Sequence, residues 1–174
     1  QIQNEFKDYY KFIVCRNPWR RIVSYYKNKK VAVWWKNKTW PIDVRDRTLN
    51  SENFTFRQLV EYVYKTPDRF LEQHVQSQTS NLDGINFDKI VKLENFSLQM
   101  NDVCDKLKID NRDFTNPNKT LETGNKTIVS DLNPKEFTDD NMPSYECFYD
   151  ENLKEMISFK FKKDIEFFNY KFED

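Results

Sequence analysis

Residues 12–26 read Phe12-Ile-Val-Cys-Arg-Asn-Pro-Trp-Arg-Arg-Ile-Val-Ser-Tyr-Tyr26, which predicts a short buried strand followed at once by a helix. The run from Phe12 to Cys15 is apolar and of strand length. Asn17 is a favourable N-cap, and Pro18 suits the first helical position, where no backbone N–H is needed. The unpaired amides and the positive dipole end at such a helix start favour an anion.

The polar side chains of this stretch are spaced to meet on one anion. Arg16 ends the predicted strand with a planar guanidinium that suits phosphate or sulfate. At about 3.6 residues per turn, Ser24 shares a helix face with Arg20 or Arg21. The other faces carry the large apolar side chains, which are Trp19, Ile22, Val23 and Tyr26. We therefore predict that one arginine, one hydroxyl and a helix N-terminus bind one anionic group.

The remaining elements alternate in type along the chain. They are a helix from about residue 56 to 64, a helix 68–79, a strand 87–93, a helix 96–107, a mostly irregular stretch 110–148 and a helix 150–168. A capping box at Thr55 and Gln58 marks the start of the first of these helices. Loops as long as 110–148 often act as functional lids. The order predicts an α/β fold, in which a parallel sheet is flanked by helices.

Composition limits the kinds of partner. The chain has 174 residues, enough for one core, and its 15 Phe, 9 Tyr and 4 Trp supply much buriable area. Its 28 basic residues balance its 28 acidic ones, so we expect no nucleic-acid partner and anion binding only at local clusters. No apolar run is long enough to span a membrane, and membrane association would need an anchor outside these residues.

The strand–helix stretch resembles a known nucleotide-binding motif, in the residues Arg16-Asn-Pro-Trp-Arg-Arg21-Ile-Val-Ser24-x-Tyr. It is similar to the 3′-phosphate-binding motif of sulfotransferases that use 3′-phosphoadenosine 5′-phosphosulfate (PAPS). The branch it resembles most contains the carbohydrate sulfotransferases of the chondroitin-4 and HNK-1 type and their bacterial relatives. The resemblance implies a P-loop-NTPase-like sulfotransferase fold and PAPS as co-substrate, without a metal.

Four later segments resemble the family in the family's order. They are the helix Phe54-Thr-Phe-Arg-Gln-Leu-Val-Glu-Tyr62, the segment Gln73-His74-Val-Gln-Ser-Gln78, the strand Phe87-Asp-Lys-Ile-Val-Lys-Leu-Glu-Asn95, and the closing helix from Tyr149 to Tyr170. Two residues depart from the family, because Val75 stands for its usual Trp and Asn169 for its usual Gly. Nothing before Phe12 resembles the family's first strand, 5′-phosphosulfate loop and helix. We therefore expect a single sulfotransferase-like domain over 1–174 that lacks this first strand–loop–helix.

The resemblance assigns the nucleotide-binding residues. It implies that Arg16 and Ser24 hold the 3′-phosphate, with Arg21 either beside them or paired with a carboxylate that braces the site. Lys119 and Lys126 lie where the family folds a loop over the nucleotide, and we expect one of them to touch phosphate. Both lysines also fit an ordinary solvated loop.

The acceptor side is predicted from fewer residues. His74 is the only histidine, and a neutral imidazole suits a base that takes the acceptor proton near pH 7. Glu72 and Glu61 are alternative bases. Trp34 and Trp35 lie among lysines, which suits a sugar ring carrying acidic groups, a single-stranded nucleic acid or an insertion pinned to the core.

The predicted function is transfer of a sulfuryl group from PAPS to a hydroxyl of a carbohydrate or related small acceptor. The main alternative is a non-catalytic module of the same fold that binds a nucleotide or a glycan. A small-molecule kinase would need a Walker loop and a magnesium carboxylate, and Gly124-Asn-Lys-Thr127 lacks the first glycine and the preceding strand of such a loop.

The compartment and the redox state follow from composition. The Asn-x-Ser/Thr sequons would fit the Golgi lumen; they begin at Asn37, Asn53, Asn95, Asn118 and Asn125. A chain this rich in Asn and Lys gains sequons by chance, so a cytoplasmic bacterial or viral protein is favoured. We expect Cys15, Cys104 and Cys147 to be thiols rather than partners in a disulfide.

Overall fold

The computed structural model describes residues 6–31, 54–110, 114, 127–138 and 142–174. They form two compact units, and each is described here by itself. Unit 1 takes its described residues from 1–17, 77–119 and 163–174, and unit 2 takes its own from 18–76 and 120–162. The expectation of a single domain over 1–174 stays a prediction.

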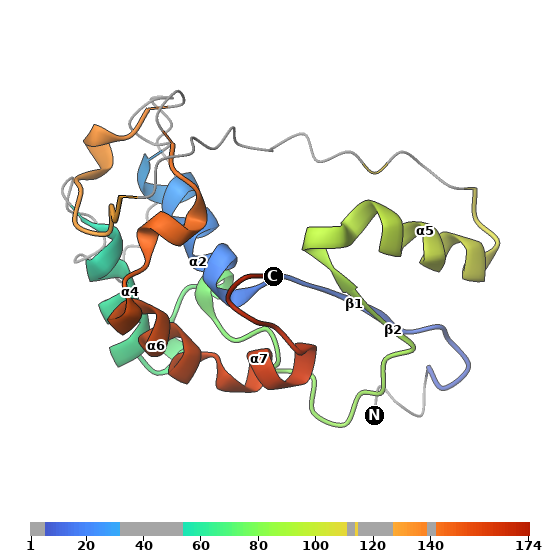
Figure 1. Cartoon of the computed structure of the whole chain (residues 1–174). Coiled ribbons are helices and arrows are strands. Elements are labelled where there is room, and N and C mark those ends of the chain that lie inside the picture. Colours follow the sequence, from blue (N-terminus) through green and yellow to red (C-terminus); the bar gives the residue numbers. More distant parts are fainter. Residues whose placement is uncertain (1–5, 32–53, 111–113, 115–126, 139–141) are drawn as a thin grey trace. The chain divides into compact units, whose positions relative to one another are not determined.

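Unit 1 contains a small parallel sheet. Strand β1 (Phe12–Cys15) pairs in parallel with strand β2 (Lys89–Lys92). After the 3₁₀ turn η5 (Leu93–Asn95), helix α5 (Phe96–Leu107) packs against β2 (Figure 1). The parallel strands and the helices that follow them confirm the predicted α/β class. The P-loop-like detail stays a prediction.

Unit 2 is built from packed helices. Helix α2 (Pro18–Tyr26) continues into one π-helical turn, η1 (Lys27–Val31). It packs against α4 (Phe56–Lys65) and α6 (Glu151–Lys160), which also contact each other (Figure 1). The start of α2 at Pro18 agrees with the prediction that proline occupies the first helical position.

The start of α4 follows its local sequence. The Thr55 hydroxyl accepts a hydrogen bond from the backbone N–H of Gln58 at 3.3 Å, and the Gln58 side chain accepts one from the N–H of Thr55 at 2.9 Å. Phe54 before the cap and Leu59 inside the helix are both buried. This pair of bonds is the predicted capping box, which satisfies two N–H groups that a helix start would otherwise leave unpaired.

The segment 68–79 is not the predicted helix. It contains two 3₁₀ turns, η3 (Asp68–Phe70) and η4 (Gln73–Val75). The carboxylate of Glu72 accepts from the backbone N–H of His74 at 2.9 Å, so a side chain takes a donor that a helix would use internally. At the end of the segment, the buried carboxylate of Asp164 accepts in the same way from the backbone N–H groups of Gln78 and Thr79.

The closing segment 150–168 is two helices rather than one. Asp150 caps α6, and α7 (Lys162–Phe168) follows after a break at Phe161. Phe161 has dihedrals of φ −108° and ψ 28°, and its ring is buried. No Gly or Pro marks the break in the sequence, which is why periodicity alone predicted a continuous helix.

The three cysteines behave as expected. Cys15, Cys104 and Cys147 are all buried, and no two of them form a disulfide. Among the helices of the described ranges, none combines the length and the apolar character that a membrane span needs.

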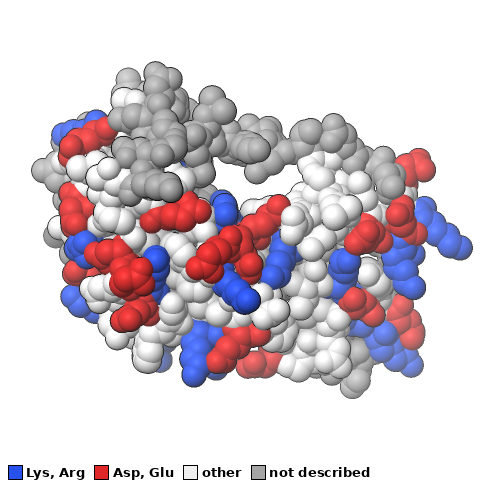
Figure 2. Space-filling model, in the orientation of Figure 1, with Lys and Arg blue, Asp and Glu red and all other residues white. Residues whose placement is uncertain are grey.

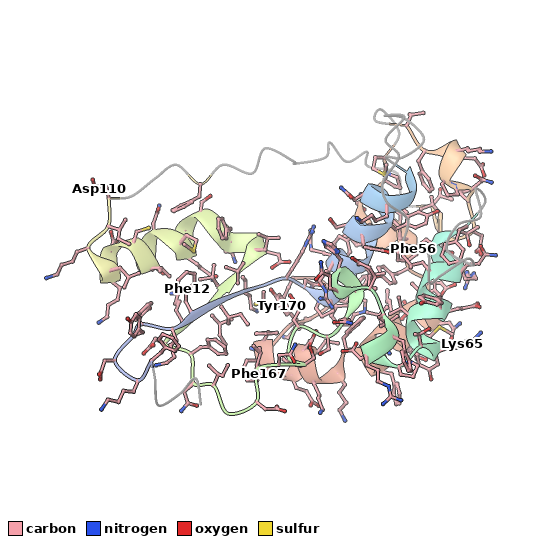
Figure 3. The ribbon with its side chains drawn as sticks, turned by 180° about the vertical axis from the view of Figure 1, so that it is seen from behind. Phe12, Phe56, Lys65, Asp110, Phe167 and Tyr170 are labelled. Atoms are coloured by element: carbon pink, nitrogen blue, oxygen red, sulfur yellow. The ribbon has the colours of Figure 1, made fainter. Side chains whose placement is uncertain are left out.

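Buried aromatic rings fill the core of unit 2. Phe56, which is labelled in Figure 3, meets Tyr26, Phe148 and Tyr149 edge-on, with ring centroids 5.5, 5.2 and 5.0 Å apart. All four side chains are buried, and edge-to-face contact is a favoured geometry for aromatic pairs. These contacts join α2, α4 and the segment before α6.

An arginine links the start of α4 to the start of α6. The Arg57 guanidinium donates to both carboxylate oxygens of Asp131, at 2.6 and 2.9 Å, and to Asp150 at 2.7 Å. The bond from Arg57 lowers the pKa of Asp131. Burial raises the pKa of Asp150, but its bond from the N–H of Leu153 and its bond from Arg57 outweigh burial and lower it.

Removal of the central ring should destabilise the protein strongly. We expect Phe56→Ala to reduce the free energy of unfolding by about 3–5 kcal/mol, because it removes buried area and leaves a cavity. Urea denaturation measures this loss. Phe159→Ala, at a side chain that is 73% exposed, is the control and should cost less than about 1 kcal/mol. Equal losses for the two variants would contradict the described core.

The Arg57 cluster should make stability depend on pH. Because the folded-state pKa values of Asp131 and Asp150 lie below their ordinary values, the cluster stabilises the fold above about pH 4 and ceases to do so as pH falls through the folded values. We expect Arg57→Met to cost about 1–2 kcal/mol at pH 7, a modest figure because Asp131 is 64% exposed. The difference from the wild type should shrink between about pH 5 and pH 2.

The matched control on the same helix is Lys65→Met. Its ion pair with Glu61 is exposed and 3.6 Å long, so its loss should cost less than about 0.5 kcal/mol at any pH. Chemical denaturation of both variants across this pH range is the measurement. A cost for Arg57→Met that stays constant down to pH 2 would show that the two carboxylates are not the cause.

Candidate functional site

The carboxyl ends of β1 and β2 form one edge of the sheet in unit 1. The Cα atoms of Cys15 and Lys92 are partners in the parallel register. The residues that follow the two strands therefore lie close together. The carboxylate of Glu94 accepts a hydrogen bond from the backbone N–H of Asn17 at 2.9 Å. Glu94 therefore holds the backbone amide of Asn17, which follows Arg16.

A glutamine holds the backbone of Arg16. The side-chain oxygen of Gln78 accepts from the N–H of Arg16 at 2.9 Å, and its side-chain nitrogen donates to the carbonyl of Arg16 at 2.8 Å. The Arg16 side chain itself is half-buried. Both backbone groups of this residue are therefore fixed by one side chain.

A buried carboxylate holds the segment that carries this glutamine. Asp164 is fully buried and accepts from the N–H groups of Gln78 and Thr79, at 2.8 and 3.0 Å. It also accepts from the hydroxyls of Ser77 and Thr79, at 2.5 and 2.7 Å. Four donors satisfy a charge that would be costly to bury without partners.

The side chain of Asn17 is anchored to the end of the described chain. It is fully buried, and its nitrogen donates to the carbonyl of Lys171 at 2.7 Å. Together with the bonds to Glu94 and Gln78, this bond connects Arg16 and Asn17 to three other segments of unit 1.

Tyr170 lies beside the carboxyl end of β1, at the opposite end of the strand from Phe12 (Figure 3). Its hydroxyl donates to Glu94 at 2.9 Å and lies 3.4 Å from the sulfur of Cys15. Burial raises the pKa of both Tyr170 and Cys15. Both groups are therefore neutral at pH 7, and the Tyr170 phenol keeps the hydrogen that it donates to Glu94 in this hydrogen bond.

Lys92 is engaged by the closing segment of unit 1. Its ammonium donates to the carbonyl of Asn169 at 3.0 Å and lies 4.3 Å from the centre of the Tyr170 ring. Asn169 has a positive φ of 50°. The same ammonium lies 3.9 Å from a carboxylate oxygen of Asp174.

In unit 2, α2 shows the predicted division of faces. Ser24, Arg20 and Arg21 are half-buried. The buried side chains are the four predicted ones, Trp19, Ile22, Val23 and Tyr26. The Arg20 guanidinium lies 4.0 Å from the centre of the Tyr145 ring. Burial, partly offset by the charge of Arg20, raises the pKa of Tyr145 to about 12.

The helix α2 contacts the segment that carries His74. The Arg21 guanidinium donates to the carbonyl of Gln76 at 2.5 Å and lies over the ring of Phe161, 5.2 Å from its centre. One turn along α2, the Tyr25 ring lies 6.4 Å from the His74 ring. Two predicted site residues, Arg21 and His74, therefore belong to segments that touch.

His74 is held by the acid two residues before it. Its Nδ1 lies 2.5 Å from a carboxylate oxygen of Glu72, and the His74 side chain is 57% exposed. An ionised carboxylate can only accept, so Nδ1 carries the hydrogen in this pair. In a neutral ring this leaves Nε2 with a lone pair that can accept a proton.

The other predicted site residues are placed as follows. Arg16 belongs to unit 1, whereas Ser24, Arg21 and His74 belong to unit 2. The remaining predicted ligands lie outside the described residues: Trp34, Trp35, Lys119 and Lys126. The predicted binding of one phosphate by both Arg16 and Ser24 therefore stays a prediction.

Charge is mixed over the surface. On the face shown in Figure 2, Lys and Arg are interspersed with Asp and Glu over the described residues. This agrees with the balanced composition of 28 basic and 28 acidic residues. Within the described ranges, no group of three or more His, Cys, Asp or Glu side chains is arranged to hold a metal ion.

Two residues that hold the backbone around Arg16, Gln78 and Asp164, were not predicted as functional. Gln78 and Asp164 appeared in the sequence only within segments that resemble the family. Their partners are far away in the chain, since Gln78 bonds Arg16 and Asp164 bonds residues 77–79. The sequence indicated only that both residues belong to segments that resemble the family, and it did not indicate which residues they bond.

Comparison with known proteins identifies the family. A model of the Sulfotransferase family matches residues 1–171. The chain therefore belongs to the sulfotransferase family, a class of transferases that move sulfuryl groups. No curated protein and no solved structure matches the chain.

Proposed function

We propose that this protein transfers a sulfuryl group from PAPS to a hydroxyl of a carbohydrate or a related small molecule. The observation that carries the proposal is the family match over residues 1–171. The guanidinium of Arg16, directly after β1, supports the choice of a phosphorylated nucleotide as donor. The resemblance of residues 16–26 to the carbohydrate sulfotransferases supports the choice of acceptor class.

Arg16 and Ser24 are the proposed ligands of the nucleotide 3′-phosphate. Arg16 stands two residues before a nine-residue helix, α2, which has no acidic residue in its first turn. The first turn itself therefore places no carboxylate at the positive dipole end, and the carboxylate bonded next to this end is Glu94, which accepts from the backbone N–H of Asn17. The guanidinium of Arg16 adds a planar set of donors that matches phosphate oxygens.

Arg21 is proposed to brace this region. Its bond to the Gln76 carbonyl fixes the guanidinium against the segment of His74. Lys119 or Lys126 is proposed to cover the nucleotide, and Trp34 and Trp35 to contact the acceptor.

His74 is the proposed general base. In an in-line transfer, the acceptor oxygen forms a bond to sulfur while the bond from sulfur to the 5′-phosphate oxygen breaks. The acceptor proton passes to Nε2 of His74, and adenosine 3′,5′-bisphosphate leaves with the electron pair. The bond from Nδ1 to Glu72 orients the ring and stabilises the imidazolium that forms. The donor is consumed as a substrate, and the proposed reaction uses no metal.

A thermal-shift experiment tests the nucleotide site. We expect adenosine 3′,5′-bisphosphate at about a hundredfold its Kd to raise Tm by about 5–10 °C, because a ligand that binds only the folded state stabilises it. Arg16→Ala should abolish the shift, and Ser24→Ala should reduce it. Adenosine 5′-monophosphate, which lacks the 3′-phosphate, should have little effect.

Arg69→Ala is the matched control for this experiment. Arg69 is an exposed arginine whose guanidinium lies over the Phe70 ring in unit 2, and its removal should leave the shift intact. A shift that is equal for both nucleotides, or that survives Arg16→Ala, would exclude the proposed 3′-phosphate site.

Turnover tests the role of His74. With PAPS and a panel of saccharides, we expect His74→Ala to lower kcat about 10²–10⁴-fold, since it removes the base, while the thermal shift with adenosine 3′,5′-bisphosphate stays unchanged. Glu72→Gln should have a smaller effect in the same direction, because an amide oxygen still accepts from Nδ1.

The control is Gln73→Ala, at the exposed neighbour of His74 on the same turn, and it should keep full activity. Full activity of His74→Ala would remove this histidine from the mechanism. A wild-type chain that binds the nucleotide but turns over with no saccharide would favour the alternative of a non-catalytic binding module.

A further inference from the structure

Gln78 forms a two-way pair with the backbone of Arg16. It accepts from the N–H group at 2.9 Å and donates to the carbonyl at 2.8 Å. Only a side-chain amide offers both an acceptor and a donor in this geometry at neutral pH, since a carboxylate has no donor. The pair fixes the two peptide groups on either side of the Arg16 Cα, and with them the direction in which its side chain leaves the backbone.

The glutamine is itself fixed. Its backbone N–H bonds Asp164 at 2.8 Å, and the same carboxylate also bonds the residues on both sides, Ser77 at 2.5 Å and Thr79 at 3.0 Å. Asp164 has no exposed surface. Three successive residues are thus tied to one buried charge, and Gln78 projects from a rigid base rather than from a free loop.

The neighbouring peptide is held as well. Glu94 accepts from the N–H of Asn17, and Glu94 is itself bonded by the Tyr170 hydroxyl at 2.9 Å. The backbone from Arg16 to Asn17 therefore has side-chain partners at three successive polar groups, and two of the three bonds come from Gln78.

We propose that Gln78 is a positioning residue for nucleotide binding, which acts by aiming the guanidinium of Arg16. This rests on the proposed function, in which Arg16 holds the 3′-phosphate. A planar guanidinium binds phosphate best when its donors are already aligned, so loss of the alignment weakens binding without removal of any group that touches the ligand.

Calorimetric titration of the full chain with adenosine 3′,5′-bisphosphate tests this role. Gln78→Met keeps the length and volume of the side chain and removes both hydrogen bonds. The expected result is a Kd about tenfold higher with the stoichiometry unchanged. A merely structural role would instead lower the fraction of competent protein, which reduces the stoichiometry and leaves Kd as it was.

Gln99→Met is the matched control in the same unit. Gln99 accepts from the backbone N–H of Lys92 at 2.5 Å, so this variant removes a glutamine-to-backbone bond at the end of β2 instead of β1. Its Kd should stay within about twofold of the wild type. A tenfold loss in the control as well would show that the effect is general to strand ends and would overturn the proposal.

A second variant, Gln78→Glu, keeps the shape of the side chain and gives a pH profile. At pH 7 its carboxylate has no hydrogen to donate to the Arg16 carbonyl, so Kd should be raised. As pH falls through about 4, the ordinary range of a glutamate carboxyl, the carboxylic acid regains a donor, and the ratio of its Kd to that of the wild type at the same pH should fall. A ratio that does not change with pH would contradict the two-way pair.

The failures of the two proposals can be told apart. If the wild type does not bind the bisphosphate, or Arg16→Ala binds as well as the wild type, the proposed function fails and the positioning role fails with it. If Arg16→Ala loses binding while Gln78→Met keeps the wild-type Kd, only the positioning role is overturned.

Discussion

The parallel pairing of β1 with β2 is the constraint on which unit 1 depends. Its register makes Cys15 and Lys92 partners, so the residues after both strands leave the sheet at one edge. Glu94 then reaches the backbone of Asn17, and Tyr170 reaches Glu94. A shift of register by one residue would break this chain of bonds, because it would exchange the faces of the side chains along a strand.

The two units carry different parts of the proposed chemistry. In unit 1, the side chains of Gln78 and Glu94 accept hydrogen bonds from the backbone N–H groups of Arg16 and Asn17 and so fix this backbone. In unit 2, α2 contacts the turn of His74 through Arg21 and Tyr25. In the proposed function, the same helix carries Ser24, a ligand of the phosphate.

Local signals were enough to predict several features of this chain. Pro18, the capping box of Thr55 and Gln58, and the apolar face of α2 depend on residues close in sequence, and the structure agrees with them. The helix predicted over 68–79 was wrong because backbone N–H groups of this segment donate to carboxylates instead of to helical carbonyls. For Gln78 and Thr79 that carboxylate belongs to Asp164, far along the chain. The role of Gln78 could not be predicted for the same reason, since Arg16 lies 62 positions away. A periodic pattern carries no information about such partners.

Asn169 occupies a backbone conformation that few residues with a side chain adopt. The sulfotransferases that the chain resembles usually have glycine there, and Asn169 adopts a φ of 50°. Asparagine is among the few residues with a side chain that enter the left-handed region at low cost. Asparagine is therefore compatible with the bend after α7, where the carbonyl of Asn169 accepts from Lys92. A position with this torsion angle accepts asparagine as well as glycine, so asparagine at 169 adds little strain to the bend.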